Sequence, residues 1–144
     1  MVKYEKLSGA IKIWNRKIKR IWMGTMRKIK DVKDALGLFE EAAIKQGEAI
    51  DEGNSKAANR NYDKIAEVAK FLRANKCIKE LSVFYEHSNV SVRLFAAAYL
   101  LPVDEERSIK VLDEIAKMKV LGSLDAKMTI QEWKNGNLRN YYTL

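Results

Sequence analysis

The sequence predicts an all-α protein of five to seven helices. Apolar residues recur every three or four positions in every long window, which is the spacing of one face of a helix. No alternating stretch of useful length competes with this pattern. One proline and seven glycines in 144 residues are too few for the turns of a β-sandwich or barrel. At this length, folding buries roughly 68–70% of the surface of the unfolded chain, so one core is expected to suffice.

The first expected helix places five apolar residues on one face: Leu7, Ile11, Trp14, Ile18 and Ile21. Gly24 can end this helix and Thr25 can cap a second one. The apolar spacing nevertheless continues from Ile29 to Ile50 before Gly53 ends the stretch. One long kinked helix and two separate helices therefore both fit this part of the chain.

Asn54 and Ser55 are suitable N-caps for the next helix. Its expected buried face consists of Ala58, Tyr62, Ile65, Ala69 and Leu72. A shorter helix, ending near His87, carries three apolar residues at helical spacing: Ile78, Leu81 and Phe84.

Asn89 is expected to cap a strongly apolar helix that Pro102 ends. Residues 104–106 place three carboxylates in the first turn of the following helix, where the helix dipole favours them. The buried stripe of that helix is predicted to be Ile109, Leu112, Ile115 and Met118. Gly122 is assigned to a loop, and a last short helix around 126–134 is closed by Asn135 and Gly136.

Residues 87–100 resemble the first helix of a HEAT repeat, an α-helical hairpin that stacks into solenoids. The resemblance rests on Asn89 as a cap, on Val92-Arg93 three and four positions later, and on the small residues 96–98. It implies that a neighbouring helix approaches the small residues closely and that Arg93 reaches a carboxylate or carbonyl of an adjacent repeat. Val90 stands where the repeat usually has proline, and no second copy has a clear Val-Arg. The expected architecture is therefore a HEAT-like helical bundle, a degenerate α-solenoid.

A wider stretch, roughly residues 32–136, resembles a family of small bacterial HEAT-like proteins with a domain of unknown function. The matching segments are Glu-Ala-Ala-Ile-Lys-Gln-Gly-Glu-Ala (41–49), Ala-Asn-Arg-Asn-Tyr-Asp-Lys-Ile (58–65) and Ala-Lys-Met-Thr-Ile-Gln-Glu-Trp-Lys-Asn-Gly (126–136). Proteins of this kind occur as immunity partners of polymorphic or contact-dependent toxins. The resemblance thus implies a protein partner, and it does not extend to the first 30 residues.

Charge divides the chain into a basic segment, residues 1–30, and a helical domain, residues 31–144. The segment has a net charge of +9 and the domain a net charge of −1. Three interpretations of the segment remain open: its apolar stripe packs on the domain, the segment binds a membrane surface or an acidic protein, or it binds a phosphate backbone. In the last two cases the contact residues would include Arg16, Lys17, Lys19 and Arg20.

Nothing in the sequence predicts catalysis, a metal or a cofactor. The single cysteine, Cys77, excludes an internal disulfide and a cysteine zinc cluster. Cys77 and His87 lack a nucleophile elbow and are interpreted as a packed thiol and a histidine at a helix end. Adjacent acidic pairs diverge by about 100° around a helix and cannot share a substrate. No small-molecule substrate is therefore expected.

The sequence is interpreted first as that of a cytoplasmic, non-enzymatic immunity protein that occludes the active site of a cognate toxin domain. No apolar stretch approaches the roughly 20 residues that a membrane-spanning helix needs. The expected partner contacts are an acidic cluster and two tyrosines near the C-terminus: Glu105, Glu106, Asp113, Glu114, Tyr141 and Tyr142. The alternatives are a HEAT-like nucleic-acid-binding protein and a membrane-surface adaptor acting through residues 1–30. Nucleic acid is disfavoured because the basic residues gather at one terminus.

Overall fold

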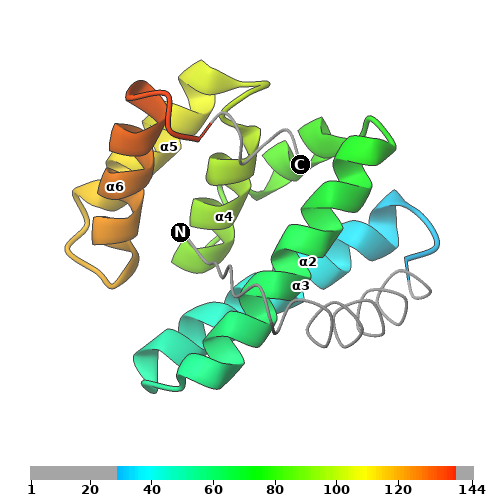
Figure 1. Cartoon of the computed structure of the whole chain (residues 1–144), viewed down its shortest axis with the longest axis horizontal. Coiled ribbons are helices and arrows are strands. Elements are labelled where there is room, and N and C mark those ends of the chain that lie inside the picture. Colours follow the sequence, from blue (N-terminus) through cyan, green and yellow to red (C-terminus); the bar gives the residue numbers. More distant parts are fainter. Residues whose placement is uncertain (1–28, 139–144) are drawn as a thin grey trace, which may run out of the picture.

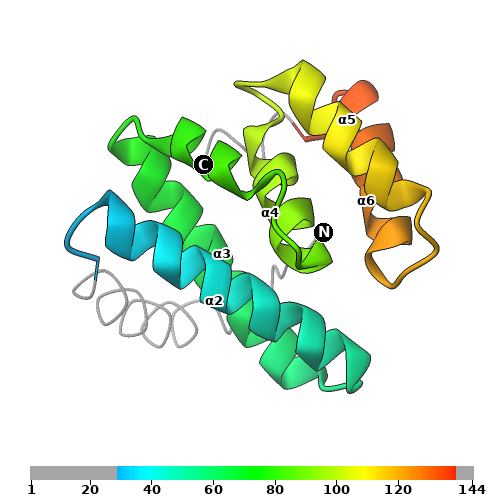
Figure 2. The same ribbon diagram turned by 180° about the vertical axis from the view of Figure 1, so that it is seen from behind.

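The computed structural model describes residues 29–138, and within this range every regular element is a helix. The elements are α2 (Val32–Asp51), α3 (Ser55–Ala74), the 3-10 helix η1 (Ile78–Phe84), α4 (Val90–Leu100), α5 (Glu105–Ala116) and α6 (Gly122–Lys134). The α2–α3 hairpin lies on one side, the α5–α6 pair on the other, and α4 lies between them (Figure 1). The opposite view shows the same arrangement (Figure 2). The all-α prediction is confirmed, and the first expected helix lies outside the described residues.

The first described helix, α2, begins after Asp31. The Asp31 carboxylate accepts a hydrogen bond from the backbone N–H of Asp34 at 2.8 Å, which satisfies one of the free N–H groups at the helix start. Ile29 and Lys30 are not helical, so a single continuous helix running through Ile29 is wrong. The helix begins after Asp31 because this residue has an extended backbone and its short side chain caps the first turn.

The α2–α3 turn and the start of α3 follow the sequence prediction. Gly53 adopts a positive φ of 69°, a conformation that favours glycine. The N–H of Asn54 donates to the Ala49 carbonyl at 2.8 Å, and the Asn54 side chain accepts from the N–H of Ala57 at 3.1 Å. One residue thus closes α2 and caps α3, which fixes the two helices as an antiparallel hairpin.

The middle of the domain is almost wholly apolar. Ile78, Leu81 and Phe84 recur every third residue, which matches the three-residue turn of η1, and all three are buried. In α4, capped by Asn89 as predicted, Val92 and every residue from 94 to 100 are buried. This helix packs against α2, η1, α5 and α6, so it forms the centre of the fold.

Arg93 is the one charged residue of α4. Its guanidinium donates to Glu114 of α5 at 3.2 Å, and only 18% of the arginine side chain is exposed. The expected contact to a carboxylate is present. Glu114 lies on the helix that pairs with α4, however, and not in an adjacent repeat.

A buried phenol ties η1 to the start of α5. The Tyr85 hydroxyl lies 3.0 Å from the Asp104 carboxylate, to which it donates, and 2.9 Å from the Ser108 hydroxyl. The guanidinium of Arg107 lies 4.8 Å from the centre of the tyrosine ring. Burial raises the pKa of Tyr85 to about 12, because the phenolate would lose its hydration.

This raised pKa predicts a pH dependence of stability. The pKa in the folded protein lies above the unfolded value of about 10. The stabilisation is therefore complete below pH 10 and is lost as the pH rises through about 12. Urea unfolding between pH 9 and pH 12 should show a steeper loss for the wild type than for Tyr85→Phe. Equal slopes for the two proteins would contradict the assignment.

Two expectations about the C-terminal helices are wrong. Met118 was expected on the buried stripe of α5, but α5 ends at Ala116 and Met118 is 42% exposed. The last helix begins at Gly122, four residues before the predicted start. The Ser123 hydroxyl explains the early start, because it accepts from the N–H of Val120 and donates to the carbonyl of Ile115. This side chain links the end of α5 directly to the first turn of α6.

Most close contacts join helices that are near one another in the chain, although α4 lies closer to α2 than to α3. The α2–α3 hairpin contacts α4, the α4–α5 pair contacts α6, and the core runs through all of them. This near-neighbour order is that of a short α-solenoid. None of the described helices combines the length and the apolar character needed to cross a bilayer.

Candidate functional site

The structure does not bring Cys77 and His87 together as a nucleophile and its base. The Cys77 thiol donates to the carbonyl of Asn75 at 3.1 Å. Nδ1 of His87 accepts from the N–H of Asn89 at 2.9 Å, so Nε2 carries the proton and donates to Glu40 at 3.0 Å. Among residues 29–138, no group of three or more His, Cys, Asp or Glu side chains could hold a metal ion.

The acidic residues predicted from sequence fall into two groups on α5. Glu105 and Glu106 lie exposed in the first turn. Asp113 pairs with Lys117 at 2.9 Å, and Glu114 pairs with Arg93. Within the described residues, only Glu105 and Glu106 can therefore contact a partner without first breaking an ion pair. The other predicted contacts lie outside the described residues: Tyr141, Tyr142, Arg16, Lys17, Lys19 and Arg20.

A surface that the sequence analysis missed lies where α5 passes into α6. Five of the eight large apolar side chains that are exposed within the described residues fall between positions 118 and 128. They are Met118 (42%), Val120 (41%), Leu121 (62%), Leu124 (65%) and Met128 (48%). Such a concentration of exposed apolar side chains is typical of an interaction site. We call these five residues the apolar face.

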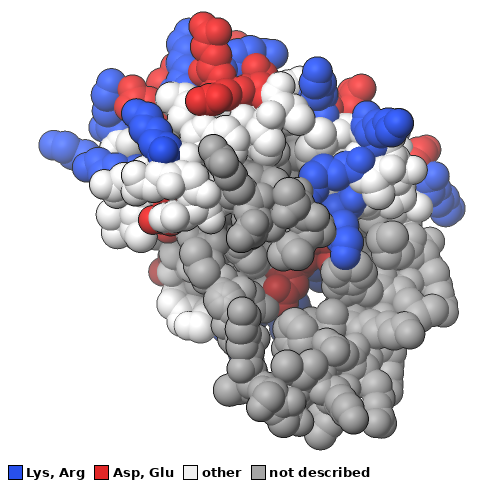
Figure 3. Space-filling model, turned by 45° about the horizontal axis from the view of Figure 1, so that its top comes forward, with Lys and Arg blue, Asp and Glu red and all other residues white. Residues whose placement is uncertain are grey.

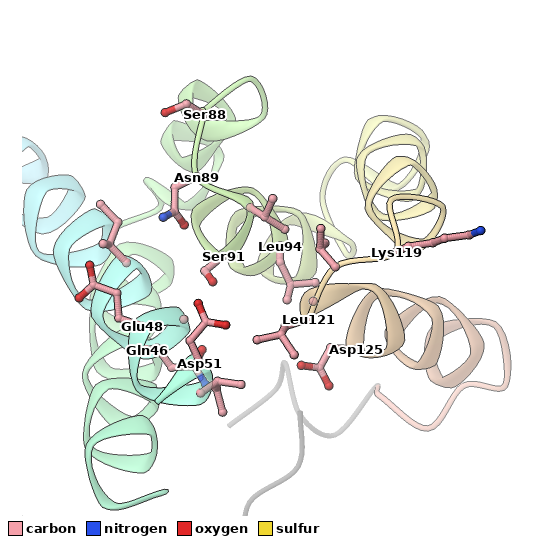
Figure 4. A pocket seen from close by; sticks show the side chains of 16 residues that line it. Gln46, Glu48, Asp51, Ser88, Asn89, Ser91, Leu94, Lys119, Leu121 and Asp125 are labelled. Carbon is pink, nitrogen blue, oxygen red and sulfur yellow. The ribbon is translucent and has the colours of Figure 1, made fainter. Parts of the chain in front are cut away.

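The apolar face adjoins a groove of about 820 Å³. Three segments line it: the C-terminal part of α2, residues 44–51; the start of α4, residues 88–94; and the α5–α6 turn, residues 119–125. Leu121 and Val120 belong to both the groove and the apolar face. The close-up shows these segments surrounding a common space (Figure 4).

The base of the groove depends on a close approach of α2 and α4. A Cβ atom added at Gly47 would overlap the Ser91 hydroxyl and would lie 3.0 Å from Ser91 Cβ. The absence of a side chain at Gly47 is therefore what lets the two helices pack at this point. The sequence shows a glycine inside a helix at position 47, but the reason for it becomes clear only from the position of α4.

The groove is more acidic than the rest of the domain. Asp51 and Asp125 point into it from opposite sides, whereas Lys119 points away (Figure 4). Neither carboxylate forms an ion pair within the described residues. Elsewhere the charges are mixed, and on the face in Figure 3 basic and acidic side chains lie beside one another. The groove thus joins apolar walls to two carboxylates that form no ion pair within residues 29–138.

The chain belongs to a family of helical proteins defined by a domain of unknown function, DUF2019, which matches residues 33–133. The expected membership of a small helical family with a domain of unknown function is therefore confirmed. A solved structure that is similar is that of the protein RPA1889 from Rhodopseudomonas palustris CGA009. It is 26% identical, with a TM-score of 0.71, and the match covers 74% of this chain and 91% of that one. No curated protein matches the chain.

Proposed function

We propose that this protein is a non-enzymatic protein-binding module, and that it acts as a cytoplasmic immunity protein for a toxin domain encoded beside it. The observation that carries the binding role is the apolar face, which leaves five large apolar side chains in water. Burying apolar surface is the main driving force of protein association, so such a face is favourable to cover.

The proposed mechanism is occlusion. The groove lies between α2, α4 and the α5–α6 turn, the apolar face continues from it along α6, and the packing of these helices on α4 makes a rigid platform. A toxin domain seated there would have its substrate path covered without any reaction by the immunity protein. Apolar side chains at the centre of such a contact supply most of the binding energy, whereas charges at its rim set partner choice. Glu105 and Glu106 are proposed as rim contacts.

Co-expression tests this proposal. Cells that express the toxic domain encoded by the adjacent gene should survive only when this protein is also present. Replacing Leu124 with Asp should abolish protection and complex formation, because it buries an unpaired charge in the interface. Leu124 is 65% exposed, so the substitution should leave the fold intact.

A matched control is available on η1. Val83 is 63% exposed and lies outside the apolar face, so Val83→Asp should protect as well as the wild type does. A harmless neighbouring gene product, or no complex between the purified proteins, would overturn the immunity role. Protection that survives Leu124→Asp would instead place the partner on another surface.

A further inference from the structure

We infer that the groove between α2, α4 and the α5–α6 turn binds a cationic amphipathic helix presented by the partner. This inference rests on the proposed function and specifies the chemistry of the segment that the protein recognises. It is argued from three observations: the apolar walls of the groove, the apolar row that continues from it along α6, and the Asp51 and Asp125 carboxylates, which face each other across the groove without an ion pair in the described part of the chain.

The walls of the groove offer apolar contact on both sides. Ile50 contributes from the end of α2 and is 47% exposed, and Leu121 contributes from the start of α6 and is 62% exposed. Val90 and Leu94 of α4 complete the lining. An apolar side chain entering between them would bury surface that is now in contact with water.

The apolar contact continues beyond the groove, which favours an elongated occupant over a small molecule. Leu121, Leu124 and Met128 are spaced i, i+3 and i+7, so they share one face of α6 and extend over roughly 10 Å. A small molecule held in the groove would leave this row uncovered. A helix laid across it would cover both, which is the usual way that an amphipathic helix binds a groove.

The acidic side chains around the groove favour a ligand that carries a positive charge. Asp51 and Asp125 face into it, and Lys119 turns away. Asp51 also lies at the C-terminal end of α2, where the helix dipole is already negative and no basic residue offsets it. A Lys or Arg on the bound helix would therefore be attracted by two carboxylates and by the negative end of the α2 dipole.

Binding of a designed peptide to the full chain tests the inference. The probe is a fluorescent 14-residue Leu/Lys peptide with leucines at helical spacing, and its control is the same peptide with Glu in place of Lys. Fluorescence anisotropy should show binding of the Leu/Lys peptide and no binding of the Leu/Glu peptide. A photoreactive group on the Leu/Lys peptide should label residues within 44–51 and 119–125.

Charge reversal provides the decisive comparison. Asp51→Lys with Asp125→Lys should weaken peptide binding about tenfold or more. Asp51→Lys should raise the denaturation midpoint, because it places a cation at the C-terminus of α2, whereas Asp125→Lys should lower it, because it places a cation in the first turn of α6. The denaturation midpoint of the double variant is therefore measured beside the affinity, and Asp51→Lys alone should already weaken binding in a protein that is no less stable than the wild type. Glu80→Lys with Glu86→Lys reverses the same amount of charge at exposed positions outside the groove and should change the affinity less than twofold.

Three results would overturn the inference: no binding of the Leu/Lys peptide, equal binding of both peptides, or greater sensitivity to Glu80 and Glu86 than to Asp51 and Asp125. Absence of binding would mean that the groove does not accept a helix of this kind. The outcome is separable from the proposed function. Protection against a toxin without peptide binding defeats only this inference, and peptide binding without protection defeats only the immunity role.

Discussion

Phe39→Ala is expected to reduce the free energy of unfolding by about 3–5 kcal/mol, as usual when a buried aromatic residue is truncated. Phe39 is fully buried on α2. Its ring stacks on Phe84 of η1 with centroids 5.9 Å apart, and meets the edge of Tyr99 of α4 at 6.3 Å. Removing it would leave a cavity where three elements join, and the rigid helices around it could not close the space.

Urea or guanidinium unfolding, followed by circular dichroism, would measure this loss. Val83→Ala is the control, because Val83 lies on η1 with 63% of its surface exposed and should change stability by less than about 0.5 kcal/mol. A loss below about 1 kcal/mol for Phe39→Ala would contradict the arrangement of α2, η1 and α4 described here.

Gly47→Ala is expected to destabilise the protein by about 1–3 kcal/mol, the usual range for overpacking. Helix propensity alone would favour alanine over glycine by about 1 kcal/mol. A loss of stability would therefore indicate overpacking against α4, whereas a gain would indicate that only helix propensity acts at this position. The added methyl group would overlap Ser91 on α4 and force α2 and α4 apart. The groove would widen at its base as a result.

Gly37→Ala, on the same helix, should have the opposite effect. A Cβ atom at Gly37 meets no heavy atom within 4 Å, so the substitution should stabilise by about 0.5–1 kcal/mol through helix propensity alone. Combining Gly47→Ala with Ser91→Gly should recover part of the loss. If Gly47→Ala stabilises as much as Gly37→Ala does, the close approach of the two helices is wrong.

The sequence predicted best those features that depend on neighbouring residues. Asn54 and Asn89 cap the helices that follow them, because capping needs only a short polar side chain beside free N–H groups. The start of α2 was harder, because Thr25 and Asp31 both satisfy that rule. The exposure of Met118 was missed for a different reason: helical spacing continued past Ala116, whereas the helix itself did not.

The candidate site could not be predicted from spacing alone. The groove brings together segments 44–51, 88–94 and 119–125, which are distant in the chain and meet only through the packing of α4. Periodicity marks Leu121, Leu124 and Met128 as one face of a helix, but it cannot tell whether another helix covers that face. Likewise, the sequence shows Glu114 as one of an acidic pair, but not that Arg93 neutralises it.

The central position of α4 has a consequence for any partner held in the groove. The first turn of α4 lines the groove, and the rest of this helix is buried against α2, η1, α5 and α6. A bound helix would therefore rest on the element through which the two halves of the domain are joined. Unfolding any part of that junction would first require releasing the partner, so ligand binding and folding are linked. The complex would resist heat and proteolysis as one cooperative unit, with the partner acting as an additional helix of the stack.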